Sequence, residues 1–351
     1  MPEVVSFAAP YHVALVACEA QPLVPASVRV RTWYSGVSAG TELTAYRGSN
    51  PYLTRTWDAG RRLFVEGAPT FDYPLQGWGY SEVGEVVEVA QGVTCPAVGD
   101  VVHGIWGHRS EAVLPAAAVA ARIWTRQDAL SGTFARVGSI ALNALLAADV
   151  RLGDRVAVFG QGVIGLLATR LAVLAAAEVV AVDLIEPRLD AALAMGASHV
   201  VRADTPGGAG AAVRSWSGGG GVDSAIELSG NDAALHEAVR SVVVDGTVAA
   251  SGFYQGGAAQ LRLGEEFHHN RVRVVASQIG GTPAALGSRW DQPRLVRTFM
   301  DQVRRGAVDA RSLVTDVVDA VDVATLFERL ERGDPEILQA VLRFPAAPED
   351  A

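Results

Sequence analysis

The spacing of hydrophobic and polar positions changes along the chain, and this change divides it into regions of different structure. Up to about residue 135, apolar residues form short alternating or valine-rich runs between turn residues, which is typical of β-strands. We expect strands at Val28–Tyr34, Val83–Val89 and Val98–His103. Helical spacing of small apolar residues first appears at Thr133–Ala148. The N-terminal region is therefore predicted to be mainly β.

From Arg155 onward, apolar strands alternate with helices. The expected strands are Val156–Phe159, Val179–Val182, Val222–Leu228, Thr247–Ser251 and Val272–Ser277. The expected helices between them include Val163–Ala177 and Arg188–Met195. Strands and helices that alternate at this spacing are typical of βαβ units. The predicted fold class is therefore α/β, with a Rossmann-type doubly wound parallel sheet.

The C-terminal region returns to a mixed pattern. We expect helices near Pro293–Arg305 and Val321–Arg332 and a closing strand near Gln339–Phe344. The tail Ala346–Ala351 is expected to fray, as chain ends commonly do. We find no internal repeat.

A glycine pattern lies where the first strand of the α/β region meets its first helix. The residues of this GxGxxG motif are Gly160, Gln161, Gly162, Val163, Ile164 and Gly165. Gly160 allows the tight turn, Gly162 lets backbone approach a pyrophosphate, and Gly165 lets the helix lie against the strand. The helix N-terminus offers N–H groups to phosphates. The motif predicts a dinucleotide site; the alternative is a glycine turn that binds no dinucleotide.

An acidic residue, Asp183, ends the next predicted strand. A carboxylate there accepts hydrogen bonds from the adenosine ribose hydroxyls and repels a 2′-phosphate. The sequence therefore predicts NAD(H) rather than NADP(H). Arg188, five residues later, could flank the same ribose.

All 29 basic side chains among the 351 residues are arginine, and there is no lysine. This excludes Schiff-base chemistry through lysine, which needs a deprotonatable primary amine. It also excludes a P-loop and the reductases that use a Tyr–Lys pair. Arginine cannot replace lysine in these roles, because it stays protonated at any working pH.

Charge and apolar content narrow the class further. A net charge of −9 argues against a nucleic-acid surface, which needs a basic patch. Cys18 and Cys95 are too few for a disulfide framework, which favours a reducing compartment. The apolar run Leu166–Ala177 is too short to span a membrane, and residues 1–20 show no secretory signal. We expect a soluble, cytoplasmic protein with no nucleic-acid or membrane partner.

The motifs resemble those of the medium-chain dehydrogenases, the zinc alcohol dehydrogenase superfamily. The similar pieces are SGVSAGTEL, GYSEVGEVVEVAQGV, GDRVAVFGQGVIG, VVAVDLIEPRLDAALAMGA, GVDSAIELSG and GTVAASGF. The resemblance implies a mainly-β, GroES-like catalytic domain at 1–136 and 289–351, with a Rossmann cofactor domain at 137–288 inserted in it and the active site in the cleft between them. It adds Ser229 and Gly252, in the last two pieces, to the predicted cofactor-binding residues.

The sequence departs from the zinc-dependent pattern of that family. Such members would carry a cysteine ligand near Ser38, and Tyr80 and Ser81 stand where a histidine and a glutamate would fall. The stretch Arg136–Asn143 has no Cys or His for a third ligand of the catalytic zinc. The structural zinc lobe of the family needs four cysteines, and between Gly84 and Ala120 there is only Cys95. Zinc sites need Cys, His or carboxylate ligands. The chain therefore resembles a zinc-free subgroup marked by Ser-x-Gly-Thr-Glu, and we expect no metal.

Without zinc or lysine, other groups must handle the hydroxyl proton. The candidate catalytic residues are Tyr80, Ser38, Glu42, His108 and Asn143. Tyr80 could donate a proton or act as a base, Glu42 could orient or deprotonate a partner, and His108 could relay protons. Each has a structural alternative: Tyr80 as packing, Glu42 as a backbone acceptor and His108 as a buried structural group.

The segment Tyr46–Tyr73 is rich in arginine and aromatic residues. It could line a pocket for an anionic or ring-shaped substrate. The alternative is an exposed lobe or a contact between subunits.

Our leading hypothesis is a zinc-independent NAD(H) oxidoreductase that interconverts a secondary alcohol and a ketone on a small polar, cyclic or sugar-like substrate. One alternative is a zinc-free, NADPH-dependent enoyl or quinone reductase, against which Asp183 argues. Another is a non-catalytic dinucleotide-binding sensor. The resemblance also implies a homodimer or homotetramer, with Val272–Pro283 as the contact.

Overall fold

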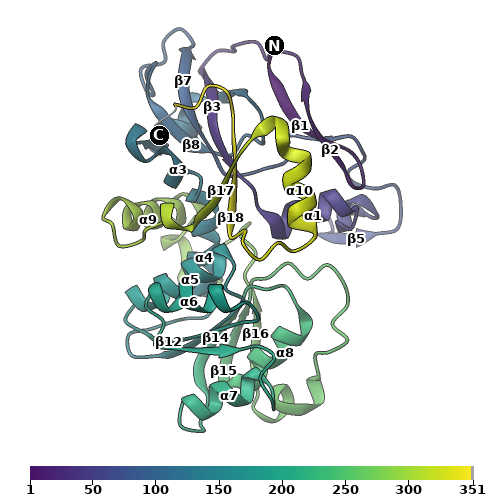
Figure 1. Ribbon diagram of the computed structural model, residues 1–351, viewed down its shortest axis with the longest axis vertical. Coiled ribbons are helices and arrows are strands. Elements are labelled where there is room, and N and C mark those ends of the chain that lie inside the picture. Colours follow the sequence, from purple (N-terminus) through teal and green to yellow (C-terminus); the bar gives the residue numbers. More distant parts are fainter. Residues whose placement is uncertain (349–351) are drawn as a thin grey trace. The chain divides into compact units, whose positions relative to one another are not determined.

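The computed structural model describes residues 1–348, and these form two compact units. Of the described residues, unit 1 comprises 1–136 together with 310–348, and unit 2 comprises 137–309. Figure 1 shows the two bodies and the elements within each of them. The last residues of the expected frayed tail, 349–351, lie outside the described part.

Unit 2 is built on a six-stranded parallel sheet with the strand order β13-β12-β11-β14-β15-β16. Its strands are β11 (Arg155–Phe159), β12 (Glu178–Asp183), β13 (His199–Arg202), β14 (Val222–Glu227), β15 (Val242–Ala250) and β16 (Arg273–Ala276). The connecting helices are α5 (Val163–Leu174), α6 (Glu186–Ala194), α7 (Ala209–Trp216) and α8 (Asp232–Ser241). The predicted doubly wound α/β fold is confirmed. Its strand order reverses between β11 and β14, where sheets of this kind bind ligands.

Small apolar side chains explain why these segments form buried parallel strands. Val156, Ala157 and Val158 are fully buried, as are Val180 and Ala181 of the neighbouring strand. Strands covered by helices on both faces carry such continuous apolar runs. The edge strand β16 differs, because all four of its residues are exposed. It lies within the segment expected to join two copies, and that contact remains a prediction.

Two further helices belong to unit 2: α4 (Ala135–Ala147), which begins at the unit boundary, and α9 (Gln292–Arg304). On α4, Gly138 lies so close to the ring of Phe299 on α9 that a Cβ atom would overlap it. Unit 2 therefore extends to residue 309, beyond the expected end of the cofactor domain at residue 288, because α9 packs onto α4.

Unit 1 contains a seven-stranded, mainly antiparallel sheet, with the order β10-β8-β7-β3-β18-β17 and β9 also on β3. A smaller sheet has the order β2-β1-β6. The strands are β1 (Glu3–Ala9), β2 (His12–Ala17), β3 (Ser27–Gly36), β6 (Leu75–Gln76), β7 (Glu82–Val89), β8 (Val101–Gly104), β9 (Glu111–Pro115), β10 (Ile123–Trp124), β17 (Val314–Asp319) and β18 (Gln339–Arg343). The predicted mainly-β domain is confirmed.

The C-terminal segment completes this unit. Strand β18 pairs antiparallel with β3, so that Val341 faces Gly36. Helices α1 (Ala39–Arg47) and α10 (Val323–Glu331) cover a core that includes Phe7, Tyr46 and Phe327. Phe7 and Phe327 meet edge to face with ring centroids 5.2 Å apart.

The aromatic segment between Tyr46 and Tyr73 packs mainly against itself. It forms the turn Pro51–Leu53 and a short hairpin of β4 (Thr56–Asp58) and β5 (Leu63–Val65). The ring of Tyr52 lies 5.1 Å from those of both Phe64 and Phe71. These contacts favour a self-contained lobe over a surface that stacks a substrate ring.

No single helix within residues 1–348 is long and apolar enough to cross a bilayer. Residues 126–132 and 135–147 reach that length and apolarity only when taken together, and they are bent by 50° at the break between them.

The contact between α4 and α9 generates a stability prediction. We expect Gly138→Ala to lower the free energy of unfolding by about 1–3 kcal/mol, because the added methyl group overlaps the Phe299 ring. Gly40→Ala is the matched control, because Gly40 is a helical glycine with open space around it in the described chain. There we expect no loss and a gain of up to about 1 kcal/mol. Chemical denaturation of both variants measures this, and equal effects would contradict the packing argument.

Candidate functional site

The glycine turn of unit 2 has the backbone geometry that the motif predicts. Gly160 has a φ of 86°, and a Cβ atom there would lie 2.8 Å from the backbone nitrogen of Ser229. At Gly165 a Cβ atom would overlap the carbonyl oxygen of Gly160. By contrast, no heavy atom of residues 1–348 lies within 4 Å of a Cβ atom built on Gly162. The turn is closed on its packed side and open at Gly162, where a pyrophosphate needs room.

Helix α5 starts directly at this opening. Gly162 is its N-cap residue, and in the described chain no side chain caps the helix. Val163 and Ile164 form its first turn, in which N–H groups have no partner within the helix. These free donors and the positive end of the helix dipole suit a phosphate group.

Asp183 holds the turn from the end of β12. Its Oδ2 accepts the backbone N–H of Gln161 at 2.6 Å, and its Oδ1 accepts that of Ile185 at 2.9 Å. Each oxygen keeps a second acceptor position for a ribose hydroxyl. The Gln161 side chain is fully buried and bonds to Val158 and Thr169, so only its backbone can face a ligand. The Nε of Arg188 is buried and has no hydrogen-bond partner within the described residues.

A buried carboxylate that the sequence did not single out lies beside the glycine turn. Glu227, at the end of β14, accepts hydrogen bonds from the N–H and hydroxyl of Ser229 and from the hydroxyl of Tyr254. The N–H of Gly252 donates to the Glu227 carbonyl at 3.0 Å. Burial raises the pKa of Glu227, although these hydrogen bonds oppose the shift. Ser229 and Gly252 therefore belong to a network that shapes this edge of the sheet.

Asn143 lies on α4 and is buried. Its Nδ2 donates to Ser277 Oγ at 3.3 Å and to the Gly281 carbonyl at 3.2 Å. Its Oδ1 finds no hydrogen-bond partner among the described residues. A buried acceptor without a partner costs free energy, so this oxygen is suited to a donor on a ligand.

In unit 1, two candidate catalytic hydroxyls meet. Tyr80, just before β7, shares a short hydrogen bond with Ser38, the N-cap residue of α1. The Tyr80 hydroxyl also lies 3.4 Å from Thr41 Oγ1. The Ser81 hydroxyl beside them is buried and has no hydrogen-bond partner within residues 1–348.

The other two candidates, Glu42 and His108, form a buried chain of hydrogen bonds with two residues that the sequence did not indicate. His108 Nε2 lies 2.7 Å from Glu42 Oε2, and His108 Nδ1 lies 2.6 Å from Ser35 Oγ. The Ser35 hydroxyl lies 3.1 Å from Glu82 Oε1. All four side chains are fully buried. Glu42 Oε1 accepts the backbone N–H of Ser38 at 2.8 Å, so this chain supports the Tyr80–Ser38 pair from beneath.

The number of protons available to these hydrogen bonds fixes the total charge of the four side chains. Ser35 has one hydroxyl proton and lies between His108 and Glu82, so it donates to one and accepts from the other. In every arrangement that satisfies all three hydrogen bonds, Glu42, His108 and Glu82 together carry one negative charge. Burial lowers the pKa of His108, but the two glutamates outweigh it and raise the pKa overall. Burial also raises the pKa of Glu82. Glu42, His108 and Glu82 thus share one proton beyond their fully deprotonated state.

Burial raises the pKa of Tyr80, and the nearby charge of Glu42 raises it further. The hydroxyls of Ser38 and Thr41 and the positive charge of Arg136 oppose the shift. Tyr80 is therefore a neutral phenol at physiological pH. Arg136, at the start of α4, is the nearby cation that the sequence interpretation did not identify.

The donors around Ser38 do not form a zinc site. Ser38, Tyr80 and Thr41 offer neutral hydroxyls, and Glu42 already bonds to a backbone N–H and to His108. Zinc in proteins takes thiolate, imidazole or carboxylate ligands. Within residues 1–348, the only group of three such side chains close enough to share an ion lies elsewhere, in unit 2.

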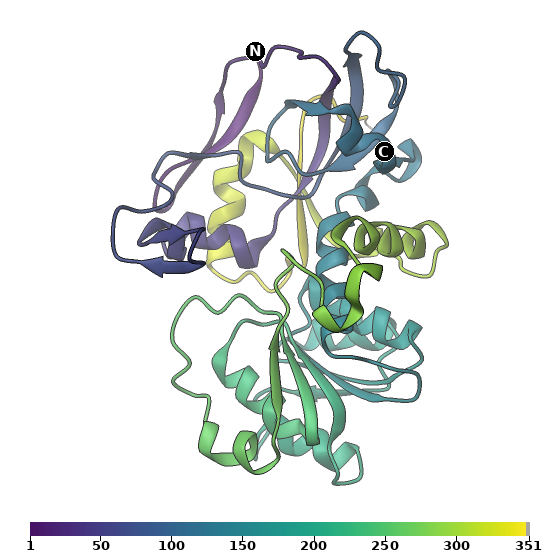
Figure 2. The ribbon, with the colours of Figure 1, turned by 180° about the vertical axis from the view of Figure 1, so that it is seen from behind.

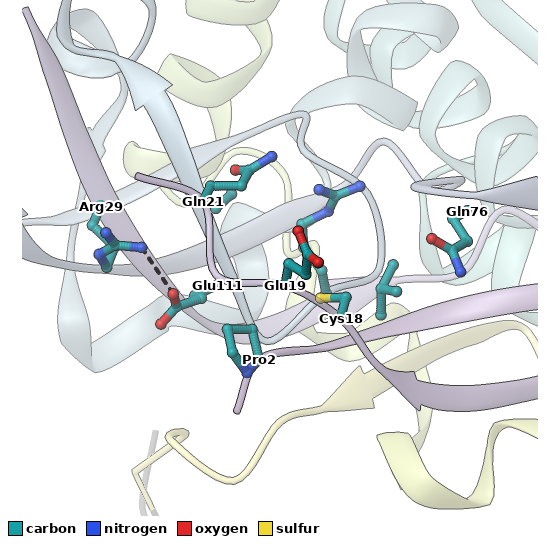
Figure 3. Close-up of a pocket in the computed structure, with 10 residues that line it drawn as sticks. Pro2, Cys18, Glu19, Gln21, Arg29, Gln76 and Glu111 are labelled. Carbon is teal, nitrogen blue, oxygen red and sulfur yellow. Dashed lines mark hydrogen bonds and ion pairs between the residues drawn. The ribbon is translucent and has the colours of Figure 1, made fainter. Parts of the chain in front are cut away.

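A separate hollow of about 410 Å³, including its open mouth, lies in unit 1 and is shown in Figure 3. Arg29 donates to Glu111 at 2.9 Å on its wall, and Gln76 and Arg109 also line it. The structure describes all of the catalytic and cofactor-binding residues predicted from the sequence, and none of them lines this hollow. We assign it no role in the chemistry.

Comparison with known proteins places the chain in a family. The sequence profile of the family described as zinc-binding dehydrogenase matches residues 163–292. The chain is 30% identical over 320 residues to D-guloside 3-dehydrogenase of Escherichia coli, covering 88% of this chain and 90% of that protein. Among solved structures it is similar to an Escherichia coli oxidoreductase of unknown specificity, with a TM-score of 0.80, 19% identity and coverage of 98% and 99%.

It is also similar to the structure of 2R,3R-butanediol dehydrogenase from Bacillus subtilis, with a TM-score of 0.77 and 21% identity over 98% of this chain and 99% of that one. The similar structures show the shared fold, and the near full-length match to D-guloside 3-dehydrogenase shows the family. The chain belongs to the zinc-type alcohol dehydrogenase superfamily, the medium-chain dehydrogenases.

Proposed function

We propose that the protein is a zinc-independent, NAD(H)-dependent oxidoreductase that interconverts a secondary alcohol and a ketone on a small, sugar-like substrate. Family membership supports oxidoreductase action on alcohols. The observation that carries the finer proposal is the hydrogen-bonded pair of Tyr80 and Ser38. The resemblance of the sequence motifs implies that these hydroxyls stand where zinc-dependent members of the family carry metal ligands.

The proton chemistry follows from the state of Tyr80. A bound nicotinamide supplies or accepts the hydride. In ketone reduction the oxygen of the substrate needs a proton, and a neutral phenol is suited to donate it. The Arg136 charge and hydrogen bonds from Ser38 and Thr41 would then stabilise the phenolate left behind. In alcohol oxidation the same groups act in reverse.

Glu42 and His108 act through these hydroxyls. Both are fully buried, and each bonds to a neighbour at two atoms. Glu42 fixes the backbone of Ser38, and His108 fixes Glu42. We therefore assign both as positioning residues, and we withdraw the direct proton relay that the sequence suggested for His108.

The cofactor site is supported by the open glycine turn, the uncapped start of α5 and Asp183. Asn143 offers its unpartnered Oδ1 to a ligand. For the substrate, the relative named D-guloside 3-dehydrogenase makes glycosides with a secondary ring hydroxyl the first class to test.

The cofactor prediction concerns Asp183. We expect NADH to bind at least about tenfold more tightly than NADPH in a fluorescence titration, a difference of about 1.4 kcal/mol. Asp183→Asn should reduce this preference, because it removes the charge that repels the 2′-phosphate. Asp190→Asn, an exposed carboxylate on α6, is the matched control and should leave the preference unchanged. Tighter NADPH binding by the unaltered protein would refute the NAD(H) assignment.

The reaction is tested with NAD on pyranosides, polyols, cyclitols and amino sugars, followed by the absorbance of NADH. We expect oxidation of a sugar-like secondary alcohol. On that substrate Tyr80→Phe should lower kcat by about 10²–10⁴-fold, the usual contribution of a general acid or base, and leave NADH binding intact. Tyr73→Phe is the control, because the Tyr73 hydroxyl binds only the Ala45 carbonyl in the described chain.

Two outcomes of that experiment would replace the proposal. NADPH-linked reduction of an enone or quinone without alcohol oxidation would favour the enoyl or quinone reductase. Tight NAD binding without turnover on any of these substrates would favour the sensor.

Zinc independence is tested by removing metal. After dialysis against a strong chelator we expect the turnover number to be unchanged, because the hydroxyls and Arg136 supply the polarisation that zinc would otherwise provide. Turnover that disappears with the metal while the protein stays folded, and that returns with Zn²⁺, would contradict zinc independence.

A further inference from the structure

Three side chains that no step of the proposed reaction uses converge in unit 2. His236 lies on α8, and Glu265 and Glu266 lie on the helical turn Leu263–Phe267. One ligand atom of each lies within 4.8 Å of the others. This turn follows the long loop that leaves the sheet after β15, as Figure 2 shows. We call the three residues the His236 cluster.

Two atoms of the His236 cluster are buried without a partner. His236 is 8% exposed, and its Nδ1 has no hydrogen-bond partner within residues 1–348. Glu266 Oε2 is also buried, and no donor in the described chain reaches it. A buried nitrogen or carboxylate oxygen left unpaired costs about 1–3 kcal/mol or more. Two such atoms in one cluster point to a ligand that satisfies both.

The local charge suits a cation. Glu237 is the third carboxylate here, and it pairs with Arg240 at 2.7 Å. Arg240 also approaches Glu266, but only at Oε1, 3.3 Å away, which leaves Oε2 available. Glu265 pairs with Arg262 at 3.5 Å, and both of these side chains are exposed, so the pair is easily opened. Three carboxylates against two guanidinium groups leave one negative charge.

We propose that His236, Glu265 and Glu266 bind a divalent metal ion of the zinc type. One imidazole and two carboxylates are ligands that Zn²⁺ accepts, with water completing a tetrahedron. At zinc–ligand bonds of about 2.0–2.2 Å, tetrahedral ligands lie about 3.3–3.6 Å apart. The exposed side chain of Glu265 can rotate to close the remaining gap.

Such an ion would fasten the segment between β15 and β16 to α8. The same segment begins with Gly252 and Tyr254, which bond to Glu227 near the glycine turn. Another tie between segment and helix is the hydrogen bond from the Gln260 N–H to Asp232, at 2.8 Å. The ion is thus a structural one that supports the loop beside the predicted cofactor site, and the proposal does not depend on the reaction proposed above.

The test measures Zn²⁺ and Co²⁺ binding to the full chain by calorimetry and by metal analysis after gel filtration. We expect one ion per chain and a higher unfolding temperature when it is bound. His236→Gln should weaken binding by at least about tenfold. His199→Gln is the matched control, because His199 is exposed, stacks on Trp216 and belongs to no cluster of ligands in the described chain. It should bind the ion as the unaltered protein does.

Glu265→Gln is the second variant, because an exposed side chain can be changed without disturbing the core. It should also weaken binding and abolish the metal-dependent rise in unfolding temperature. Binding of no ion by the unaltered protein, or unchanged binding by both variants, would overturn the proposal. Loss of the ion in Ser38→Ala instead would place it at the candidate catalytic site. The His236→Gln protein should still turn over its substrate, because the proposed ion takes no part in the chemistry.

Discussion

The buried contact between Glu42 and His108 is the interaction on which the candidate site of unit 1 depends. It joins the first helix to the loop before β9, and through Ser35 it reaches Glu82 on β7. Removing one partner of a buried ion pair commonly destabilises a protein by about 3–5 kcal/mol, because the other charge is left without compensation. Ser35 and Glu82 face each other across β3 and β7, so the register of the sheet itself holds the acceptor in place. Gly79 completes the arrangement, because a Cβ atom there would lie 2.7 Å from the His108 ring.

In the function that we propose, neutral hydroxyls and one guanidinium group polarise the substrate carbonyl above this contact. The absence of lysine closes the Tyr–Lys route, and the Ser38 region lacks the ligands for zinc. Arg136 can stabilise a phenolate without ever losing its own proton. The division of labour that we propose follows from burial: Tyr80 is partly exposed and can meet a substrate, whereas the groups beneath it are sealed from water.

The sequence predicts the elements whose patterns are local. The strand–turn–helix at Gly160 and the repeated strands of unit 2 follow from spacing within a few residues. The hairpin of β1 and β2 and the helices α7 and α8 were not singled out, because their apolar positions are few or interrupted by small residues. Site residues show the same limit. Ser38, Glu42, Tyr80 and His108 were found from their chemistry, but Glu82, just before the predicted strand Val83–Val89, was not singled out. Only its pairing with Ser35, 47 positions away, places it inside. Likewise, the pattern predicts α9 as a helix, but only the contact of Phe299 with Gly138 assigns it to unit 2.

The pairing of β18 with β3 has a consequence for the order in which the protein forms during synthesis. Residues 137–309 are complete before the last part of unit 1 leaves the ribosome, so unit 2 can fold while its host is unfinished. Until residues 339–343 emerge, the edge of β3 at Tyr34–Gly36 has no neighbour, although β9 already pairs with Ser27–Arg31 on that edge. An open strand edge invites pairing with other chains. The unit that holds the proposed proton donor is thus the last to close, and this short stretch of open strand edge persists until the end of translation.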